Sequence, residues 1–140
     1  MSQSDLIVYL VDDDDDDLEF LKEAFADKKC TSDIRCFNAG TKVIHQLHNV
    51  NLKQLPDLIV VDHQLALTDD TDLIKIVRAQ KQYNIITLVV HSSSLQPSKA
   101  TMLLEKGADL CLEKGNCFDE IKAHIANFRE AVRKRRALFA

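Results

Sequence analysis

Three continuous apolar segments constrain the fold of this chain more than any other feature of its sequence. They are Leu6–Val11, Leu58–Val61 and Ile85–Val90, and each has the length of a strand. An apolar run without alternation is typical of a strand covered on both faces, as in a parallel sheet. Two shorter segments, Ile34–Phe37 and Leu110–Leu112, are also predicted to be strands.

Helical patterns alternate with these strands. Apolar residues recur at helical spacing in five segments, which are Leu18–Phe25, Val43–Leu47, Leu73–Val77, Pro97–Gly107 and Phe118–Val132. Five strands alternating with five helices imply right-handed βαβ crossovers and a three-layer α/β/α sandwich. We therefore predict a flavodoxin-like doubly wound parallel sheet with strand order 2-1-3-4-5.

Length and composition are those of one globular domain. The chain has 140 residues, of which 46% are hydrophobic and 29% charged, with a net charge of −4. We expect a single domain over 1–140, with its core at about 6–132 and a basic helical end at 133–140. The charge does not indicate a nucleic-acid partner. Without a signal-peptide pattern or a run of about 20 apolar residues, we expect a cytoplasmic protein and no membrane partner.

Polar residues follow the strands at the points where the strands end. Asp12 and Asp13 follow the first strand, Asp62 the third, Ser92 the fourth and Lys114 the fifth. Ligands of open α/β sheets bind beyond the carboxyl ends of the strands, where the strand order reverses. The sequence therefore predicts that three carboxylates, a hydroxyl and an ammonium group meet at one edge of the sheet.

This set of side chains suits phosphoryl chemistry on a carboxylate. Neighbouring carboxylates stay ionised only beside compensating positive charge, and Lys114 supplies one such charge. A hard divalent cation with oxygen ligands, Mg²⁺, would supply the rest and could hold a phosphoryl group. Spacing alone does not indicate which carboxylate is the nucleophile.

The sequence resembles the receiver domains of two-component response regulators. The acidic pair Asp12–Asp13, the strand PDLIVVD, Ser92 thirty residues later and the segment GADLCLEKG match the motifs of that family in order. The resemblance covers about 6–132. It implies a stand-alone bacterial receiver that accepts a phosphoryl group on Asp62 from a sensor histidine kinase or a phosphotransfer protein, and that signals to a downstream target protein or within a phosphorelay.

The resemblance also implies a role for each site residue. Asp13 and Asp62 would bind Mg²⁺ together with the backbone carbonyl of Gln64, and Asp12 would assist through water. Ser92 and Lys114 would contact the phosphoryl oxygens. Such a receiver is not an enzyme with a separate substrate, because it assists its own phosphorylation and dephosphorylation. Two more positions, Gln64 and Ser94, would modulate the rate of hydrolysis.

Four positions depart from the family pattern. Ala66 replaces the usual proline after the acceptor, Asp70 replaces a glycine, and Gly115 replaces the proline after the lysine. Cys111 replaces the aromatic switch residue of the fifth strand, so a coupling between Ser92 and an aromatic ring is not expected. A more mobile loop is expected at Gly115.

The remaining acidic, cysteine and basic residues have simpler interpretations. Asp14 is expected to cap the first helix, and Asp15–Asp17 to lie in its first turn, where negative charge is favourable. The four cysteines, Cys30, Cys36, Cys111 and Cys117, form two C-x5-C pairs. Cys36 and Cys111 are predicted on opposite edge strands about 19 Å apart, too far for a shared metal ion. The basic segment 133–136 suits a helix C-terminus.

Two other functions remain open at this point. The motif VYLVDDD also fits an aspartyl phosphatase of the haloacid dehalogenase type, with Asp12 as nucleophile and Asp14 as acid and base, but no further acidic strand follows Lys114. The other alternative is a receiver fold that acts as an adapter without phosphorylation. The four departures from the family pattern would favour it, at Ala66, Asp70, Gly115 and Cys111. His91, beside Ser92, is interpreted as a packing residue or as a modulator of the site.

Overall fold

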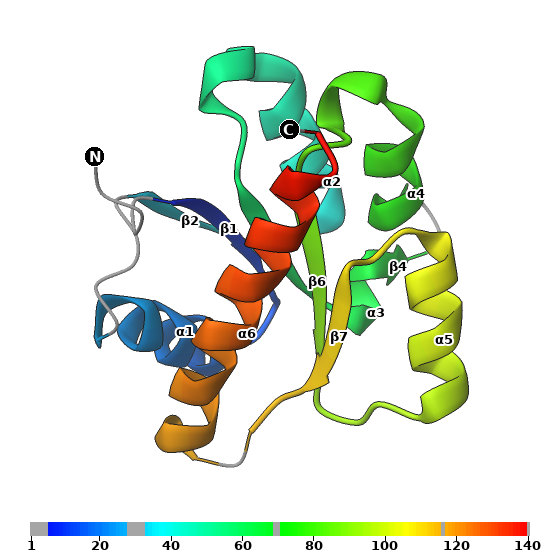
Figure 1. Cartoon of the computed structure of the whole chain (residues 1–140). Helices are drawn as coiled ribbons and strands as arrows, with labels where there is room; N and C mark the ends of the chain where they lie inside the picture. The colour runs from blue at the N-terminus through cyan, green and yellow to red at the C-terminus, as the bar shows by residue number, and fades with distance from the viewer. Residues whose placement is uncertain (1–5, 28–32, 69–70, 116, 140) are drawn as a thin grey trace.

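The computed structural model describes residues 6–27, 33–68, 71–115 and 117–139. Its main sheet contains five parallel strands in the order β2-β1-β3-β6-β7, which confirms the predicted doubly wound order 2-1-3-4-5 (Figure 1). The strands are β1 (Ile7–Val11), β2 (Asp33–Phe37), β3 (Leu58–Asp62), β6 (Thr87–Ser92) and β7 (Leu110–Glu113).

Helices cover both faces of this sheet, as the predicted three-layer sandwich requires (Figure 1). The five helices are α1 (Asp15–Asp27), α2 (Gly40–Asn49), α4 (Leu73–Ala79), α5 (Pro97–Lys106) and α6 (Phe118–Ala137). The helices α1 and α6 pack on one face, and α2, α4 and α5 pack on the other. No described helix is both long and apolar enough to cross a membrane.

The core consists of two apolar clusters, one on each face of the sheet. Successive strand residues point to opposite faces, so Val8 joins the cluster beneath α1 and α6, and Tyr9 joins the one beneath α2 and α4. The rings of Phe25 and Phe128 stack with their centroids 6.1 Å apart where α1 meets α6. Because both faces of β1, β3 and β6 are covered, these strands read as continuous apolar runs.

Several short elements were not predicted from the sequence. The segment after β3 forms α3 (His63–Ala66) and a small hairpin of β4 (Leu67–Thr68) and β5 (Thr71–Asp72). Two 3-10 turns, at Leu52–Gln54 and Lys81–Tyr83, precede β3 and β6. All five are too short to produce a hydrophobic period. Asp70 lies outside the described residues.

Helix ends follow the sequence in two places and differ from it in one. Pro97 begins α5, and Gly107 ends it with a φ of 128°, a conformation that a Cβ atom disfavours. Asn38 is of a residue type that often caps helices, but the N-cap of α2 is Ala39. Ala39 has no side chain that can cap the helix, but Val43 and Leu47 stabilise α2 by packing it against the sheet.

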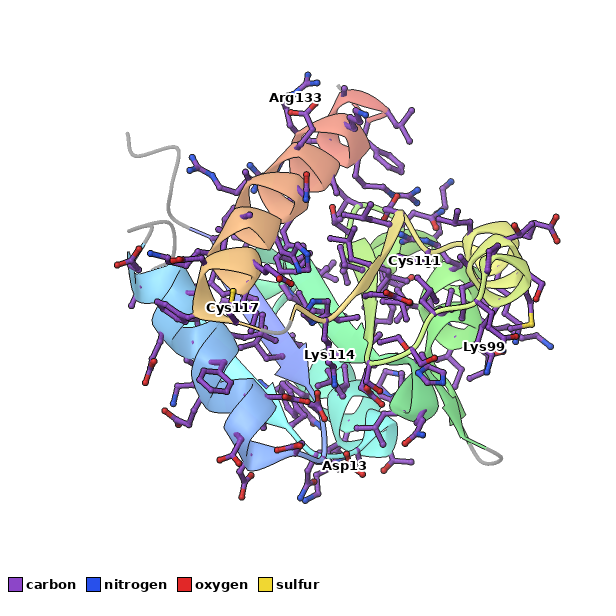
Figure 2. The ribbon with its side chains drawn as sticks, turned by 90° about the horizontal axis from the view of Figure 1, so that it is seen from below. Asp13, Lys99, Cys111, Lys114, Cys117 and Arg133 are labelled. Carbon is purple, nitrogen blue, oxygen red and sulfur yellow. The ribbon has the colours of Figure 1, made fainter. Side chains whose placement is uncertain are left out.

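The basic end of α6 is attached to the ends of the strands opposite to those that carry the predicted site. Arg135 donates to the Asn84 carbonyl at 2.8 Å, and Arg136 pairs with Asp57 at 2.6 Å. Asp57 also accepts a hydrogen bond from the Ile7 backbone at 2.8 Å. Figure 2, seen from below relative to Figure 1, places the acidic start of α1 and the basic end of α6 on opposite sides of the molecule. The cations of this helix end thus have specific partners as well as a favourable helix dipole.

Cys36 and Cys111 lie on β2 and β7, the two edge strands, as predicted. Cys30 lies outside the described residues. The other three cysteines are free thiols, of which Cys36 and Cys117 are exposed.

Candidate functional site

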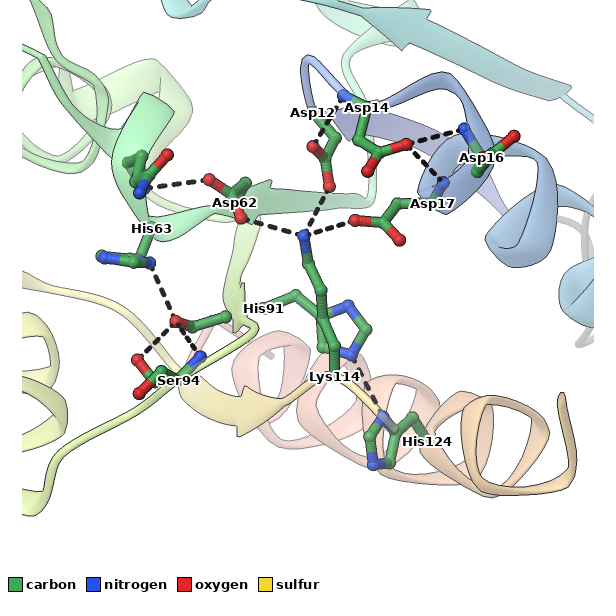
Figure 3. Close-up of polar contacts among 12 residues, drawn as sticks. Asp12, Asp14, Asp16, Asp17, Asp62, His63, His91, Ser94, Lys114 and His124 are labelled. Carbon is green, nitrogen blue, oxygen red and sulfur yellow. Dashed lines mark hydrogen bonds and ion pairs between the residues drawn. The ribbon is translucent and has the colours of Figure 1, made fainter. Parts of the chain in front are cut away.

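The ammonium group of Lys114 lies between three carboxylates at the carboxyl ends of the strands (Figure 3). Its Nζ atom is 2.8 Å from Asp12 Oδ2, 2.9 Å from Asp62 Oδ1 and 2.7 Å from Asp17 Oδ2. The structure therefore brings together three of the residues predicted from strand ends, which are Asp12, Asp62 and Lys114. It adds a fourth, Asp17.

The backbone of the sheet positions these side chains. The Asp12 N–H donates to the Phe37 carbonyl at 3.0 Å, which extends the pairing of β1 with β2 by one residue. The Lys114 N–H donates to the Ser92 carbonyl at 2.7 Å and extends the pairing of β7 with β6 in the same way. The Asp12 and Lys114 side chains thus begin where regular pairing ends, and Asp62 is the last residue of β3. This is why strand ends in the sequence predicted the site.

Asp17 is the site residue that sequence reasoning missed. Asp14 caps α1 as expected, because its Oδ1 accepts from the Asp16 N–H at 2.9 Å and from the Asp17 N–H at 3.4 Å. Asp15–Asp17 lie in the first turn of α1 as predicted, but Asp17 has a further role there, because its carboxylate reaches Lys114. Asp13 is exposed, and none of the contacts of Lys114 involves it.

Burial and hydrogen bonding act on the charges of the site in opposite directions. Asp12 and Asp62 are only 4% and 8% exposed. Burial raises the pKa of Asp12, although its hydrogen bonds with Lys114 and with the Asp14 backbone work against that rise. For Lys114, burial alone would lower the pKa, but the hydrogen bonds to its three carboxylates outweigh burial and raise it. The lysine is therefore firmly protonated.

The buried Ser92 side chain contacts residues other than Asp62 and Lys114. Its hydroxyl donates to the Ser94 carbonyl at 2.8 Å, and its Oγ lies 2.8 Å from His63 Nδ1 and accepts from the Ser94 N–H at 3.2 Å (Figure 3). Ser92 is thus at the predicted edge of the sheet, but its hydroxyl bonds to His63 and Ser94 rather than to the carboxylates. His63, directly after Asp62, is a second residue that the sequence did not single out.

The two positions predicted to modulate hydrolysis, Gln64 and Ser94, both have exposed side chains near the site. The Gln64 N–H donates to Asp62 Oδ2 at 3.1 Å, so both carboxylate oxygens of Asp62 are engaged. Ser94 contacts the site through its backbone.

His91 is a buried packing residue, one of the two interpretations of this position. It is 2% exposed, its Nε2 lies 3.1 Å from His124 Nδ1, and its ring meets the Phe128 ring edge to face with centroids 5.8 Å apart. Burial, with the nearby His124 and Lys114, lowers the pKa of His91 to about 3. The ring is neutral at physiological pH.

Cys111 and Gly115 show how the chain accommodates two departures from the receiver pattern. The Cys111 thiol is half-buried against α5, 3.9 Å from the Ala100 carbonyl, and burial raises its pKa to about 11. A Cβ atom on Gly115 would lie 2.5 Å from the Glu120 Cβ, so the close approach of α6 favours glycine after the lysine. The expected mobility of this loop stays a prediction.

The donor chemistry of the site fits a hard divalent cation. Three carboxylates face one ammonium group, which leaves an excess of two negative charges (3 − 1 = 2) on oxygen atoms. In the described part of the chain, no three His, Cys, Asp or Glu side chains are already arranged around a metal position. Instead, the Lys114 ammonium group occupies the centre of the cluster.

Comparison with known proteins identifies the family. A family model described as the response regulator receiver domain matches residues 8–126. No curated protein sequence matches the chain.

Solved structures of response regulators share the fold at low sequence identity. The chemotaxis response regulator CheY4 of Vibrio cholerae is 17% identical, with a TM-score of 0.73 over 89% of this chain and 98% of that one. The phosphorylated cyanobacterial phytochrome response regulator RcpA is 18% identical, with a TM-score of 0.75 over 90% and 92%. The Mn²⁺-bound response regulator Rcp1 is 17% identical, with a TM-score of 0.72 over 89% and 95%.

Proposed function

The chain belongs to the response regulator receiver domain family, and we propose that it accepts a phosphoryl group on Asp62 in a Mg²⁺-dependent reaction. The observation that carries this proposal is the placement of Lys114, whose ammonium group lies 2.9 Å from Asp62 Oδ1 and 2.8 Å from Asp12 Oδ2. The donor would be the phosphohistidine of a sensor histidine kinase or of a phosphotransfer protein.

In this reaction Asp62 acts as the nucleophile. One of its oxygens attacks the phosphorus atom, the N–P bond of phosphohistidine breaks, and the imidazole leaves with a proton from solvent. The product is an acyl phosphate on Asp62. Lys114 stabilises the negative charge of the transferred oxygens, because its Nζ already lies against the acceptor carboxylate.

The carboxylates have a second role in holding the cation. Asp13 and Asp62, with the backbone carbonyl of Gln64, are the proposed ligands of Mg²⁺, and Asp12 would assist through water. When bound, Mg²⁺ neutralises charge on the phosphoryl oxygens and on the acidic cluster. The Mn²⁺-bound form of Rcp1, a protein with the same fold, supports this proposal. The exposed Asp13 can turn toward a cation without breaking a contact to Lys114.

We propose further that the protein assists its own phosphorylation and dephosphorylation rather than acting as an enzyme on a separate substrate. Gln64 and Ser94, whose side chains are exposed, would affect the access of water to an acyl phosphate. Signalling would proceed through contacts with a downstream target protein or through a phosphorelay. With the half-buried Cys111 on β7, the output would not use an aromatic ring at this position.

One alternative is weakened by the contacts of Asp14. A phosphatase with Asp12 as nucleophile needs Asp14 as a free acid and base. The Asp14 carboxylate instead accepts two backbone N–H groups at the start of α1. The adapter alternative has one observation in its favour, because the Ser92 hydroxyl is held by His63 and Ser94 rather than facing Asp62.

Intact-mass measurement after incubation with acetyl phosphate tests the proposal. Wild-type protein with Mg²⁺ should gain one phosphoryl group, and EDTA or Asp62→Asn should abolish the gain. Asp119→Asn is the matched control, since it removes an exposed carboxylate on α6 and should leave the gain intact. An adduct that survives Asp62→Asn but not Asp12→Asn would support the phosphatase. With no adduct and no binding of beryllofluoride, the adapter function would replace the proposal.

A further inference from the structure

The hydroxyl group of Ser92 is fully engaged by its neighbours. Ser92 has no exposed surface, and its Oγ lies within hydrogen-bond distance of the Ser94 carbonyl, the Ser94 N–H and His63 Nδ1. A serine hydroxyl has one proton and two lone pairs. These three contacts therefore use its whole capacity.

The direction of each bond follows from the chemistry of the partners. A carbonyl oxygen can only accept, so the single Ser92 proton is donated to Ser94 O at 2.8 Å. The Ser94 N–H can only donate, and it occupies one lone pair of Oγ at 3.2 Å. Since the hydroxyl has no second proton, His63 Nδ1 must carry a proton and donate it to the other lone pair at 2.8 Å.

This arrangement competes with the contact to a phosphoryl oxygen that the family resemblance implies for Ser92. To bind a phosphoryl oxygen on Asp62, the hydroxyl must donate its only proton to that oxygen and so release the Ser94 carbonyl. Rotation of the buried side chain would also separate Oγ from His63. Breaking these buried hydrogen bonds costs free energy, because water does not reach the buried groups to replace the lost partners.

His63 is well placed to control this step. It directly follows Asp62 and begins α3, so it is fixed to the strand that carries the acceptor while its ring reaches the end of β6 (Figure 3). The His63 side chain is partly exposed, and its Nδ1 atom faces the buried hydroxyl.

We propose that His63 is a positioning residue that holds the Ser92 hydroxyl on the Ser94 carbonyl and thereby weakens the binding of a phosphoryl group at Asp62. This inference rests on the proposed function, because it concerns the affinity of the same site. In this proposal His63 takes the place of the aromatic switch residue, which is Cys111 in this chain, as the side chain coupled to Ser92.

The hydrogen bond itself can be tested on the unphosphorylated protein. Long-range ¹H–¹⁵N NMR at mildly alkaline pH distinguishes a neutral imidazole protonated on Nδ1 from one protonated on Nε2. In wild type, His63 should carry its proton on Nδ1. In Ser92→Ala, which lacks the acceptor, the proton should move predominantly to Nε2. A wild-type His63 protonated on Nε2 would overturn the inference.

The effect on the site can be tested with beryllofluoride, a mimic of the phosphoryl group, by titration calorimetry in Mg²⁺. His63→Ala should bind it roughly two- to tenfold more tightly than wild type, because one hydrogen bond no longer opposes the rotation of Ser92. His63→Asn, whose side-chain amide can donate from a similar place, should return the affinity toward that of wild type. His45→Ala on the exposed face of α2 is the matched control.

A double-mutant cycle decides whether His63 acts through Ser92. In the Ser92→Ala background, His63→Ala should change the affinity for beryllofluoride no further. An equal gain in both backgrounds, or equal affinities of wild type and His63→Ala, would overturn this inference alone. Failure of wild type both to bind beryllofluoride and to accept a phosphoryl group would overturn the proposed function, and this inference with it.

Discussion

Acidification should destabilise this protein through the buried side chain of His91. His91 is 2% exposed and lies against His124, Phe128 and Lys114. Burial lowers its pKa to about 3, from an ordinary value of 6.5. Between these two values the unfolded chain binds a proton that the folded protein does not, so the free energy of unfolding falls as the pH falls below about 6.5.

The size of the effect follows from the two pKa values. Each pH unit within the interval costs about 1.4 kcal/mol. Lowering the pH from 7 to 5 should therefore remove about 2 kcal/mol of stability through His91 alone. This figure depends mainly on the ordinary histidine pKa, because both pH values lie well above the pKa of the folded state.

Urea denaturation between pH 7 and 5, in EDTA to exclude metal binding, would measure this loss. His91→Gln keeps a polar group near His124 but cannot titrate, so its stability should depend on pH less steeply than that of wild type. A uniform loss of stability in the variant does not affect the comparison. His45→Gln, exposed on α2, should give a curve parallel to wild type. Parallel curves for wild type and His91→Gln would refute the reasoning.

Two further predictions concern stability and can be checked by the same denaturation assay. Lys114→Ala leaves two buried carboxylates without a cation, so it should lower the free energy of unfolding by about 3 kcal/mol in EDTA, and Mg²⁺ should restore part of this loss. Asp17→Asn removes only a partly exposed partner of Lys114 and should lower the free energy of unfolding by less than about 1 kcal/mol. Equal losses in the two variants would contradict this argument from charge. Gly107→Ala should cost more than about 1 kcal/mol, since φ is 128° and the new Cβ would lie 2.6 Å from Cγ of Arg78. The exposed Ser98→Ala on α5 is its control, and an unchanged stability of Gly107→Ala would show that the turn can relax.

The sheet could be predicted because its central strands are covered on both faces. Nearly every residue of such a strand is buried, so the strand appears in the sequence as a continuous apolar run. In the helices between the strands, apolar residues recur with a clear helical period. The hairpin of β4 and β5 and the turn α3 could not be predicted in this way. Each spans four residues or fewer, so no periodic signal distinguishes it from a loop.

The site residues that could be predicted are those whose positions depend on the backbone alone. Asp12, Asp62 and Lys114 lie at strand ends, and strand order alone brings strand ends together. Asp17 and His63 enter the site through side-chain conformation, which the chain acquires only when α1 and α3 have packed. In the sequence, Asp17 is one of several acidic residues in a first helical turn, and nothing there indicates that it alone turns inward.

The orientation of α6 separates the charges of the molecule, because its basic end lies at the end of the sheet opposite to Asp62. The acidic run Asp12–Asp17 lies at the end of the sheet that holds Asp62, whereas the exposed Arg133 lies toward the other end (Figure 2). Near Arg133, Arg135 and Arg136 pair with Asp109 and Asp57. An asymmetric charge distribution of this kind orients a protein before contact. A partner with a positive surface would be drawn toward the end of the sheet that holds Asp62, and the rate of that encounter would fall as salt screens the field.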